Sequence, residues 1–511
     1  MNAIWYCVRR DGAAKHSGWT HDVALDDLPR RVGAGGGDVV EVCVAGGFRP
    51  VAPARHARVF RRRDRGIVGL EIAWREDVAR LAPTRMIAAN LGFTRAIEKY
   101  LREWNAGFDD FTADGGLRVF SARQFLLSGA GGEHTALFRG STLVAPTPEV
   151  GENRAADLAG GIGRWMLRNL SADGSLPYKY WPSRGVESPA DNAIRRFLAS
   201  LSLARLGEYR GDAAIRDAAV RNLRFNLARY FQTLGDGRGA IVEPAGAKLG
   251  AAALAALSIL ESPARDEFTT ELAMLTAGVS SLADDELGFR TFFFPPERDG
   301  ENWNFYSGEA LLFWAESRRR GALGAPSLEH CAATFARCRE RHFRARNPAF
   351  VPWHAQACAS LFAQTGRREF ADFVFEISDW LLPMQQWDGL SPDLRGRFYD
   401  PRRPEFGPPH AASTGAYVEG LADALALARM LGDSDRAAAY ERVVDRGLRS
   451  LRQLQFRGPH DTFYISNKDR VLGALRTEAY DNAVRVDSAA HALAAAVKLL
   501  RPLQSMGGRT W

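Results

Sequence analysis

Four acidic side chains and two histidines between residues 191 and 491 have surroundings that suit acid–base chemistry. They are Asp191, Glu309, Glu419, Asp487, His354 and His491. Two carboxyl groups that share a cavity can protonate a leaving oxygen and activate a water molecule, as in glycoside hydrolysis. A histidine beside a carboxylate can instead remove a proton next to a carbonyl group. These six residues are the candidate catalytic groups.

The neighbours of these candidates sharpen the prediction. Glu309 lies between small and apolar residues, so burial should raise the pKa of its carboxyl and suit a general acid. Asp487 and His491 are four residues apart and therefore share one helical face. Structural roles remain open as alternatives: Asp191 could cap a helix, and Glu309 could form a salt bridge within the helices. Asp487 and His491 could likewise be a structural pair.

Aromatic, arginine and histidine side chains gather around the same candidates. The candidate substrate-binding residues are Tyr178, Tyr180, Trp181, Arg184, Arg195, Trp303, Tyr306, Trp353, His410, Tyr417 and Arg485. Aromatic faces with hydrogen-bonding groups between them suit the flat faces and hydroxyl rims of sugars. A guanidinium group can bind a carboxylate through two parallel hydrogen bonds. The pattern predicts a saccharide substrate, and the arginines suit an anionic one, although each aromatic residue could simply pack its loop.

Composition and charge exclude several classes of function. The 511 residues carry 67 Lys and Arg against 60 Asp and Glu, and this net charge of +7 is not gathered in one run, which disfavours nucleic-acid binding. The absence of an apolar run of ~18 residues predicts no membrane span. Five cysteines without a metal-binding pattern predict reduced thiols and, with no signal-like N-terminus, a cytoplasmic location. No metal site is expected, and no cofactor motif is found.

The elements that must position these residues are predominantly helices. Apolar spacing predicts twelve of them. They are expected at 153–170, 192–208, 212–231, 247–261, 267–282, 304–320, 326–344, 352–366, 368–386, 413–432, 434–455 and 487–502. Alternate segments are apolar on all sides, as at 249–260, whereas the segments between them are amphipathic. The predicted fold is mainly α, an (α/α)6 toroid of six helical hairpins with an inner and an outer ring; an open stack of hairpins is the alternative.

The chain is expected to divide near residue 150. Residues 1–150 predict a smaller N-terminal α+β or β-rich domain, whose role the sequence does not indicate. Its expected elements are strands at 39–44, 66–73, 119–127 and 135–144 and a helix over 83–104. Residues 151–511 are expected to form the toroid and to carry the site. Links that enter the apolar helices are long and those that leave them are short, so one rim should carry the loops and the site.

The helical layout of 151–505, with the segment Asp-Gly-Ser-Leu-Pro-Tyr at 173–178, resembles the six-hairpin glycosidase superfamily. It is also similar to the N-acylglucosamine 2-epimerase group. The resemblance implies a site in the funnel at the N-terminal ends of the inner helices. For the epimerase group it also implies a histidine pair for proton transfer, with His354 and His491 as candidates here. Such a fold does not determine the reaction.

Three functions follow as alternatives. The first is glycoside hydrolysis of an acidic saccharide by carboxylate acid–base catalysis. The second is a sugar epimerase, isomerase or lyase that transfers protons through histidine or tyrosine. The third is a non-catalytic scaffold that binds a saccharide or a protein. The sequence does not indicate the sugar, the bond or the oligomeric state.

Overall fold

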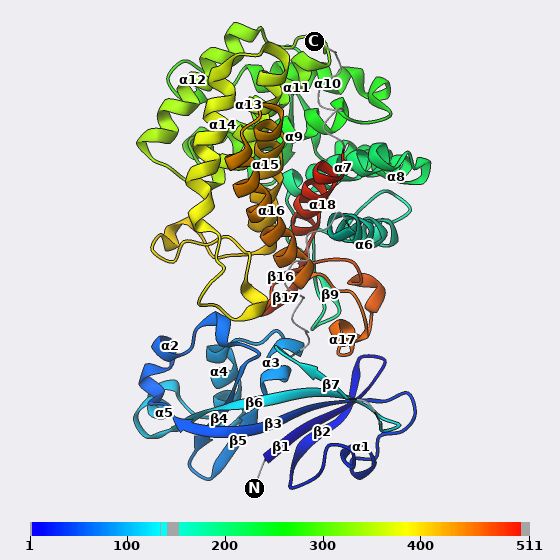
Figure 1. Ribbon diagram of the computed structural model, residues 1–511, viewed down its shortest axis with the longest axis vertical. Helices are drawn as coiled ribbons and strands as arrows, with labels where there is room; N and C mark the ends of the chain where they lie inside the picture. Colours follow the sequence, from blue (N-terminus) through cyan, green and yellow to red (C-terminus); the bar gives the residue numbers. More distant parts are fainter. Residues whose placement is uncertain (1–2, 133, 141–152, 502–511) are drawn as a thin grey trace.

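The computed structural model describes residues 3–132, 134–140 and 153–501, and its N-terminal part is a curled antiparallel sheet (Figure 1). Seven strands pair in the order β2-β1-β3-β6-β4-β5, with β7 added beside β6. Their bounds are β1 Ala3–Arg10, β2 Ala13–His21, β3 Val39–Pro50, β4 Val68–Trp74, β5 Asp77–Leu81, β6 Gly116–Ser128 and β7 His134–Leu137. The β-branched residues of β3 and β4 explain why the sequence predicted strands there.

Short helices pack beside this sheet. They are α1 Leu28–Arg31, α2 His56–Val59, α3 Pro83–Ala88, α4 Phe93–Glu103 and α5 Phe108–Asp114. Ile97 and Leu101 of α4 pack in one core cluster with Leu70 and Ile72 of β4. The single helix expected over 83–104 is in fact two, because Asn90 has a positive φ of 48° that ends the first helix.

Six buried helices form the inner ring of the second part. They are α7 Ala193–Arg210, α9 Leu249–Leu260, α11 Trp303–Arg319, α13 Val351–Thr365, α15 Ala411–Met430 and α18 Val486–Leu500. Every residue of α9 is buried, as expected of a helix that is small and apolar on all sides. The inner helices contact one another in the order α7, α9, α11, α13, α15, α18 and back to α7. The ring is closed, which confirms the toroid and excludes the open stack.

Six amphipathic helices form the outer ring. They are α6 Asn153–Asn169, α8 Ala213–Tyr230, α10 Thr269–Ser280, α12 Leu328–Arg344, α14 Arg368–Leu381 and α16 Ser434–Leu454. Each packs mainly on one inner helix: α6 on α18, α8 on α7, α10 on α9, α12 on α11, α14 on α13 and α16 on α15. In α16, Val444 and Leu448 are buried, whereas Glu441 and Arg442 face solvent. All twelve helices lie close to the predicted ranges.

The long links contain short strands that the apolar pattern did not predict. Two four-stranded sheets have the orders β10-β11-β12-β15 and β16-β17-β8-β9, and β13 pairs with β14. The bounds are β8 Lys179–Trp181, β9 Val186–Glu187, β10 Phe231–Gly235, β11 Arg238–Glu243, β12 Gly246–Lys248, β13 Ala283–Asp284, β14 Gly288–Phe289, β15 Phe292–Phe294, β16 Arg476–Glu478 and β17 Asp481–Arg485, with a short helix α17 at Pro459–Thr462. These links hold the entrances of the inner helices in place.

The N-terminal sheet lies against the rim that carries these links (Figure 1). Arg139, just after β7, forms a fully buried ion pair with Asp393 in the link between α14 and α15. Asn90 donates a hydrogen bond of 2.9 Å to Asp481 at the start of β17. The division expected near residue 150 falls at 141–152, outside the described residues. None of the helices in the described part combines the length and apolar character that a membrane crossing needs.

Candidate active site

A cavity of about 490 Å³ lies at the N-terminal ends of the inner helices. All six of these helices, or the residues that cap them, contribute to its wall. The predicted site residues that line it are Arg195, Tyr306, Glu309, Trp353, His410, Tyr417, Arg485, Asp487 and His491. The link between α14 and α15 adds Phe398, Tyr399 and Asp400 to the wall without filling the cavity. The alternating helices thus bring together residues that are far apart in the sequence.

Glu309 is a buried carboxyl whose Oε2 atom has no hydrogen-bond partner in the described part of the chain. Its residue is 3% exposed, and burial raises the pKa of the carboxyl to about 8, with only a small opposing effect of Lys248. Gly250 of α9 makes the space for this group, because a Cβ at that position would overlap Glu309 Oε2 and the Tyr306 ring. Glu309 is therefore protonated at neutral pH and can donate a proton into the cavity.

Asp487 is buried as well, but it is held between two arginines. Its Oδ2 atom lies 3.0 Å from Arg195 Nε, and its Oδ1 atom accepts a hydrogen bond of 3.0 Å from Arg485 Nε. Burial opposes the ionised form, but the two guanidinium groups outweigh it and lower the pKa of Asp487 to about 2. Asp487 therefore stays ionised and fixes two arginine side chains at the cavity wall.

The buried carboxylate of Glu419 fixes the orientation of the His491 ring. Its Nδ1 atom lies 3.0 Å from Glu419 Oε2, and Arg205 Nη1 lies 3.3 Å from Glu419 Oε1. Burial raises the pKa of Glu419, but the hydrogen bond from His491 and the charges of Lys498 and Arg205 outweigh it, so the net pKa is lowered. An ionised carboxylate can only accept a hydrogen bond, so Nδ1 carries the hydrogen, which leaves Nε2 of His491 as the acceptor.

His410 has the opposite orientation. It caps the N-terminus of α15, where its Nδ1 atom accepts a hydrogen bond of 3.1 Å from the backbone N–H of Ser413. Burial and the nearby charge of Arg485 lower the pKa of His410 to about 4, so the ring is neutral at pH 7. Its proton is then on Nε2. The cavity thus contains one histidine that can accept a proton and one that can donate a hydrogen bond.

Aromatic rings form much of the remaining wall. The rings of Trp353 and His491 lie 5.7 Å apart, and those of Phe398 and Tyr417 lie 5.2 Å apart. Burial raises the pKa of Tyr306 and of Tyr417, so both keep their hydroxyl protons. Flat apolar faces with a few fixed polar groups are the usual composition of a small-molecule site.

Three predicted catalytic residues do not line this cavity. Asp191 accepts hydrogen bonds from Arg196 and Tyr230. Burial raises the pKa of Asp191, but these hydrogen bonds outweigh it, so the net pKa is lowered. His354 is fully buried and stacks on Phe350 with ring centroids 3.4 Å apart, and burial lowers its pKa to about 3. Glu419 lies behind His491. The predicted pairing of His354 with His491 at one site is therefore not observed, because His354 points into the packing between α11 and α13.

The remaining predicted binding residues lie beside the cavity or in another cleft. Trp303 is buried and donates a hydrogen bond of 3.2 Å to the carbonyl of Leu287. Tyr178 contacts Arg195 through its hydroxyl but does not itself line the cavity. Tyr180, Trp181 and Arg184 lie in or next to the hairpin of β8 and β9, and this hairpin borders the N-terminal sheet.

Several polar residues of the wall were not among the predicted site residues. Arg298 and Asn302 precede α11, and Lys248 and Asn192 cap α9 and α7. Lys248 is ion-paired with Glu243 at 2.6 Å, and Glu243 also accepts a hydrogen bond from the N–H of Ala193 at the start of α7. Their positions directly before inner helices were the available signal.

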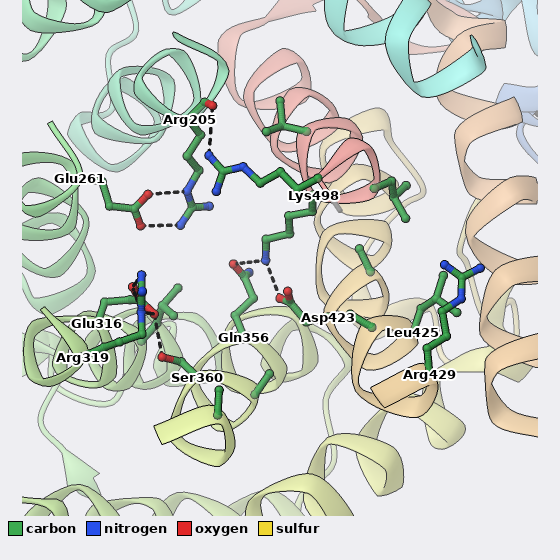
Figure 2. A pocket seen from close by; sticks show the side chains of 18 of the residues that line it. Arg205, Glu261, Glu316, Arg319, Gln356, Ser360, Asp423, Leu425, Arg429 and Lys498 are labelled. Carbon is green, nitrogen blue, oxygen red and sulfur yellow. Dashed lines mark hydrogen bonds and ion pairs between the residues drawn. The ribbon is translucent and has the colours of Figure 1, made fainter. Parts of the chain in front are cut away.

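A second cavity, of about 210 Å³, lies at the C-terminal ends of the same six helices (Figure 2). Arg205 makes two hydrogen bonds of 2.9 Å to Glu261, and Lys498 bridges Gln356 and Asp423. Glu316 pairs with Arg319 and accepts a hydrogen bond from Ser360. Each of these three carboxylates has a cationic partner, unlike Glu309.

No protein-family model matches the sequence, and no curated protein matches it. Solved structures similar to the chain include an unsaturated glucuronyl hydrolase specific for heparin (TM-score 0.49, 10% identity, 68% of this chain and 97% of that one). Another is the unsaturated glucuronyl hydrolase of Bacillus sp. GL1 (TM-score 0.46, 13% identity, 68% and 97%). A third is an alpha-1,6-mannanase of Salegentibacter sp. HEL1_6 (TM-score 0.47, 10% identity, 68% and 98%). Each of these likenesses covers about two thirds of this chain and nearly all of the other chain.

Proposed function

We propose that the protein is a glycoside hydrolase for a saccharide that carries a carboxylate, with Glu309 as its general acid. One observation carries the proposal: Glu309 and Asp487 line the same cavity with pKa values of about 8 and about 2. Carboxyl groups whose surroundings separate their pKa values in this way are typical of acid–base sites. The aromatic wall and the fixed arginines suit a sugar with an acidic group.

In the proposed reaction, the Glu309 carboxyl donates its proton to the glycosidic oxygen as the bond from that oxygen to the anomeric carbon breaks. A water molecule attacks the anomeric carbon and gives a proton to Nε2 of His491. The product gains one hydroxyl at each end of the broken bond. Glu309 then regains a proton and His491 loses one through solvent, which restores the starting state.

Asp487 is assigned to substrate binding rather than to the base. Its oxygens already accept hydrogen bonds from Arg485 and the N–H of Ser488 and form an ion pair with Arg195, and a pKa of about 2 makes it a weak base. Two arginines and one aspartate leave one positive charge at the wall. That charge can pair with a substrate carboxylate.

The test is to incubate the full chain with oligosaccharides of galacturonate, mannuronate and glucuronate and to count new reducing ends. We expect cleavage of at least one of them by the wild type and a loss of about 10³-fold in Glu309→Gln, because a general acid contributes about 10²–10⁴-fold. Glu316→Gln is the matched control, since it removes the other buried glutamate of α11, and it should retain near-wild-type activity. Cleavage that persists in Glu309→Gln would contradict the proposal.

A sugar epimerase or isomerase is the second candidate, favoured by the presence of His410 and His491 in one cavity. Proton NMR in D2O separates the two. Epimerisation replaces a carbon-bound hydrogen by deuterium, whereas hydrolysis leaves every carbon-bound hydrogen in place. The scaffold alternative has less support, because ionisable groups line the cavity and the link between α14 and α15 does not fill it.

A further inference from the structure

A separate cleft of about 480 Å³ lies between the N-terminal sheet and the toroid. Its walls come from the hairpin of β1 and β2, from α3, from the hairpin of β8 and β9, and from residues 464–467. The two sides fit closely, since a Cβ at Gly12 in the turn between β1 and β2 would overlap the backbone of Ile465. Clefts at the junction of two parts of a chain are common ligand sites.

Among the described residues, the charged side chains that line this cleft are arginines. They are Arg9, Arg85 and Arg184. Arg9 is balanced from behind by Glu41, with 2.8 Å between Arg9 Nε and Glu41 Oε2. Arg85 and Arg184 form no ion pair with any carboxylate in the described part of the chain. Two unpaired guanidinium groups at one cleft favour an anionic ligand.

Aromatic and hydroxyl groups surround these arginines. Tyr180 and Tyr464 line the cleft, together with the polar residues Ser183, Ser466 and Asn467. The guanidinium of Arg184 lies 3.9 Å from the centre of the Trp181 ring, which fixes its orientation. Aromatic faces, hydrogen-bonding groups and free guanidinium groups together suit a sugar with an acidic substituent better than a bare inorganic anion.

A short stretch of chain joins this cleft to the central cavity. Tyr178 contacts Arg195, which lines the central cavity, whereas Tyr180, two residues later, lines the cleft. The neighbouring strand β17 pairs with β8 and ends at Arg485, again at the central cavity.

We propose that this cleft is a second saccharide-binding site, which holds an acidic unit of a longer chain outside the central cavity. The class of ligand rests on the proposed function, but the existence of the site does not. Tyr180, Trp181 and Arg184, which the sequence assigned to substrate binding, then act at this cleft. The N-terminal sheet forms one wall of it, which gives that part of the chain a role in binding.

Arginine footprinting tests the site directly on the full chain. Phenylglyoxal modifies accessible guanidinium groups, and mass spectrometry reads the modified positions. We expect pentamers of the three uronates to protect Arg85 and Arg184, whereas a neutral glucose pentamer and inorganic sulfate give little protection. Arg49 is exposed at the end of β3 far from the positions that pair with β1, so it serves as the unprotected control.

The double variant Arg85→Gln/Arg184→Gln gives the second measurement. It should bind the uronate pentamer about tenfold more weakly in calorimetry, with binding of the dimer unchanged, since each charge-assisted contact is worth only a modest amount. Cleavage without protection of the two arginines would overturn the cleft and leave the proposed hydrolase intact. Protection of the two arginines without cleavage would overturn the proposed hydrolase and leave the cleft intact. The absence of both protection and cleavage would overturn both proposals. Equal protection by sulfate would reduce the cleft to a general anion site and overturn its saccharide assignment.

Discussion

The two ends of the inner ring differ in one buried carboxyl group, that of Glu309. At the C-terminal ends, Glu261, Glu316 and Asp423 each have a cationic partner. At the N-terminal ends Asp487 is likewise paired with arginines, but Glu309 Oε2 has no hydrogen-bond partner among the described residues, and burial raises the pKa of Glu309 to about 8. A buried carboxyl is therefore not by itself a sign of chemistry. A paired carboxylate holds helices together, whereas an unpaired carboxyl carries a proton that can be transferred.

The largest expected effect on stability concerns Glu309. Its raised pKa means that the folded state binds more protons than the unfolded state between about pH 4.5 and about pH 8, so stability falls as pH rises through that range. Glu309→Gln removes this loss. The variant should be more stable than the wild type at pH 9, by up to about 5 kcal/mol, with the difference vanishing near pH 4. Urea unfolding at several pH values measures this, and a difference that does not vary with pH would refute it.

The paired end should respond in the opposite direction. Glu261→Gln leaves Arg205 with only its longer contact to Glu419, and we expect a loss of about 3 kcal/mol at pH 7. Arg205 overcomes the effect of burial and lowers the pKa of Glu261 to about 2, so the stabilisation is present above pH 4.5 and is lost as pH falls toward 2. The same urea series checks the prediction. A neutral or stabilising effect at pH 7 would mean that the pairing is not structural.

Glu419 connects the two ends through His491 and Arg205. In Glu419→Gln the side-chain amide can donate as well as accept, so His491 is no longer fixed with its free nitrogen toward the cavity. We expect kcat to fall by about 10²-fold and the limb of the pH profile that reports the base to move. Asp423→Asn, one turn further along α15, is the matched control and should leave that limb in place. Equal shifts in both variants would indicate general damage to α15.

The smallest expected effect concerns the space around Glu309. Gly250→Ala places a Cβ against Glu309 Oε2 and the Tyr306 ring, and such overpacking typically costs about 1–3 kcal/mol. Activity should fall because the carboxyl must move. Gly211→Ala serves as a comparison for activity, because nothing lies within 4 Å of its added Cβ, although its positive φ of 62° adds local strain. Full activity in Gly250→Ala would show that the position of Glu309 tolerates change.

Much of the toroid is predictable because its signal is local. The all-round apolar character of 249–260 and the amphipathic character of 213–231 place these segments in the inner and outer rings without any long-range information. Glu309, Asp487 and His491 follow from the same logic, since the first turns of inner helices must meet at one rim. The helical pattern does not determine which way each side chain points. His354 was predicted at the cavity for this reason, but in the structure it faces packed residues.

What the sequence did not indicate depends on contacts between distant segments. The placement of the N-terminal sheet against the rim rests on pairs such as Arg139 with Asp393 and Asn90 with Asp481. No local pattern encodes these pairs. For the same reason the sequence did not indicate that Tyr180 and Arg184 lie at a second cleft rather than in the central cavity.

The protonation state of Glu309 is the central claim, and it can be measured without any substrate. Glutamate labelled with carbon-13 at its side-chain carboxyl is incorporated into the protein, and the resonance that disappears in Glu309→Gln is followed by NMR from pH 4 to pH 10. A midpoint near pH 8 is the predicted result. A midpoint near 4.5, the ordinary value for a glutamate, would contradict it and remove the general acid from the proposed reaction.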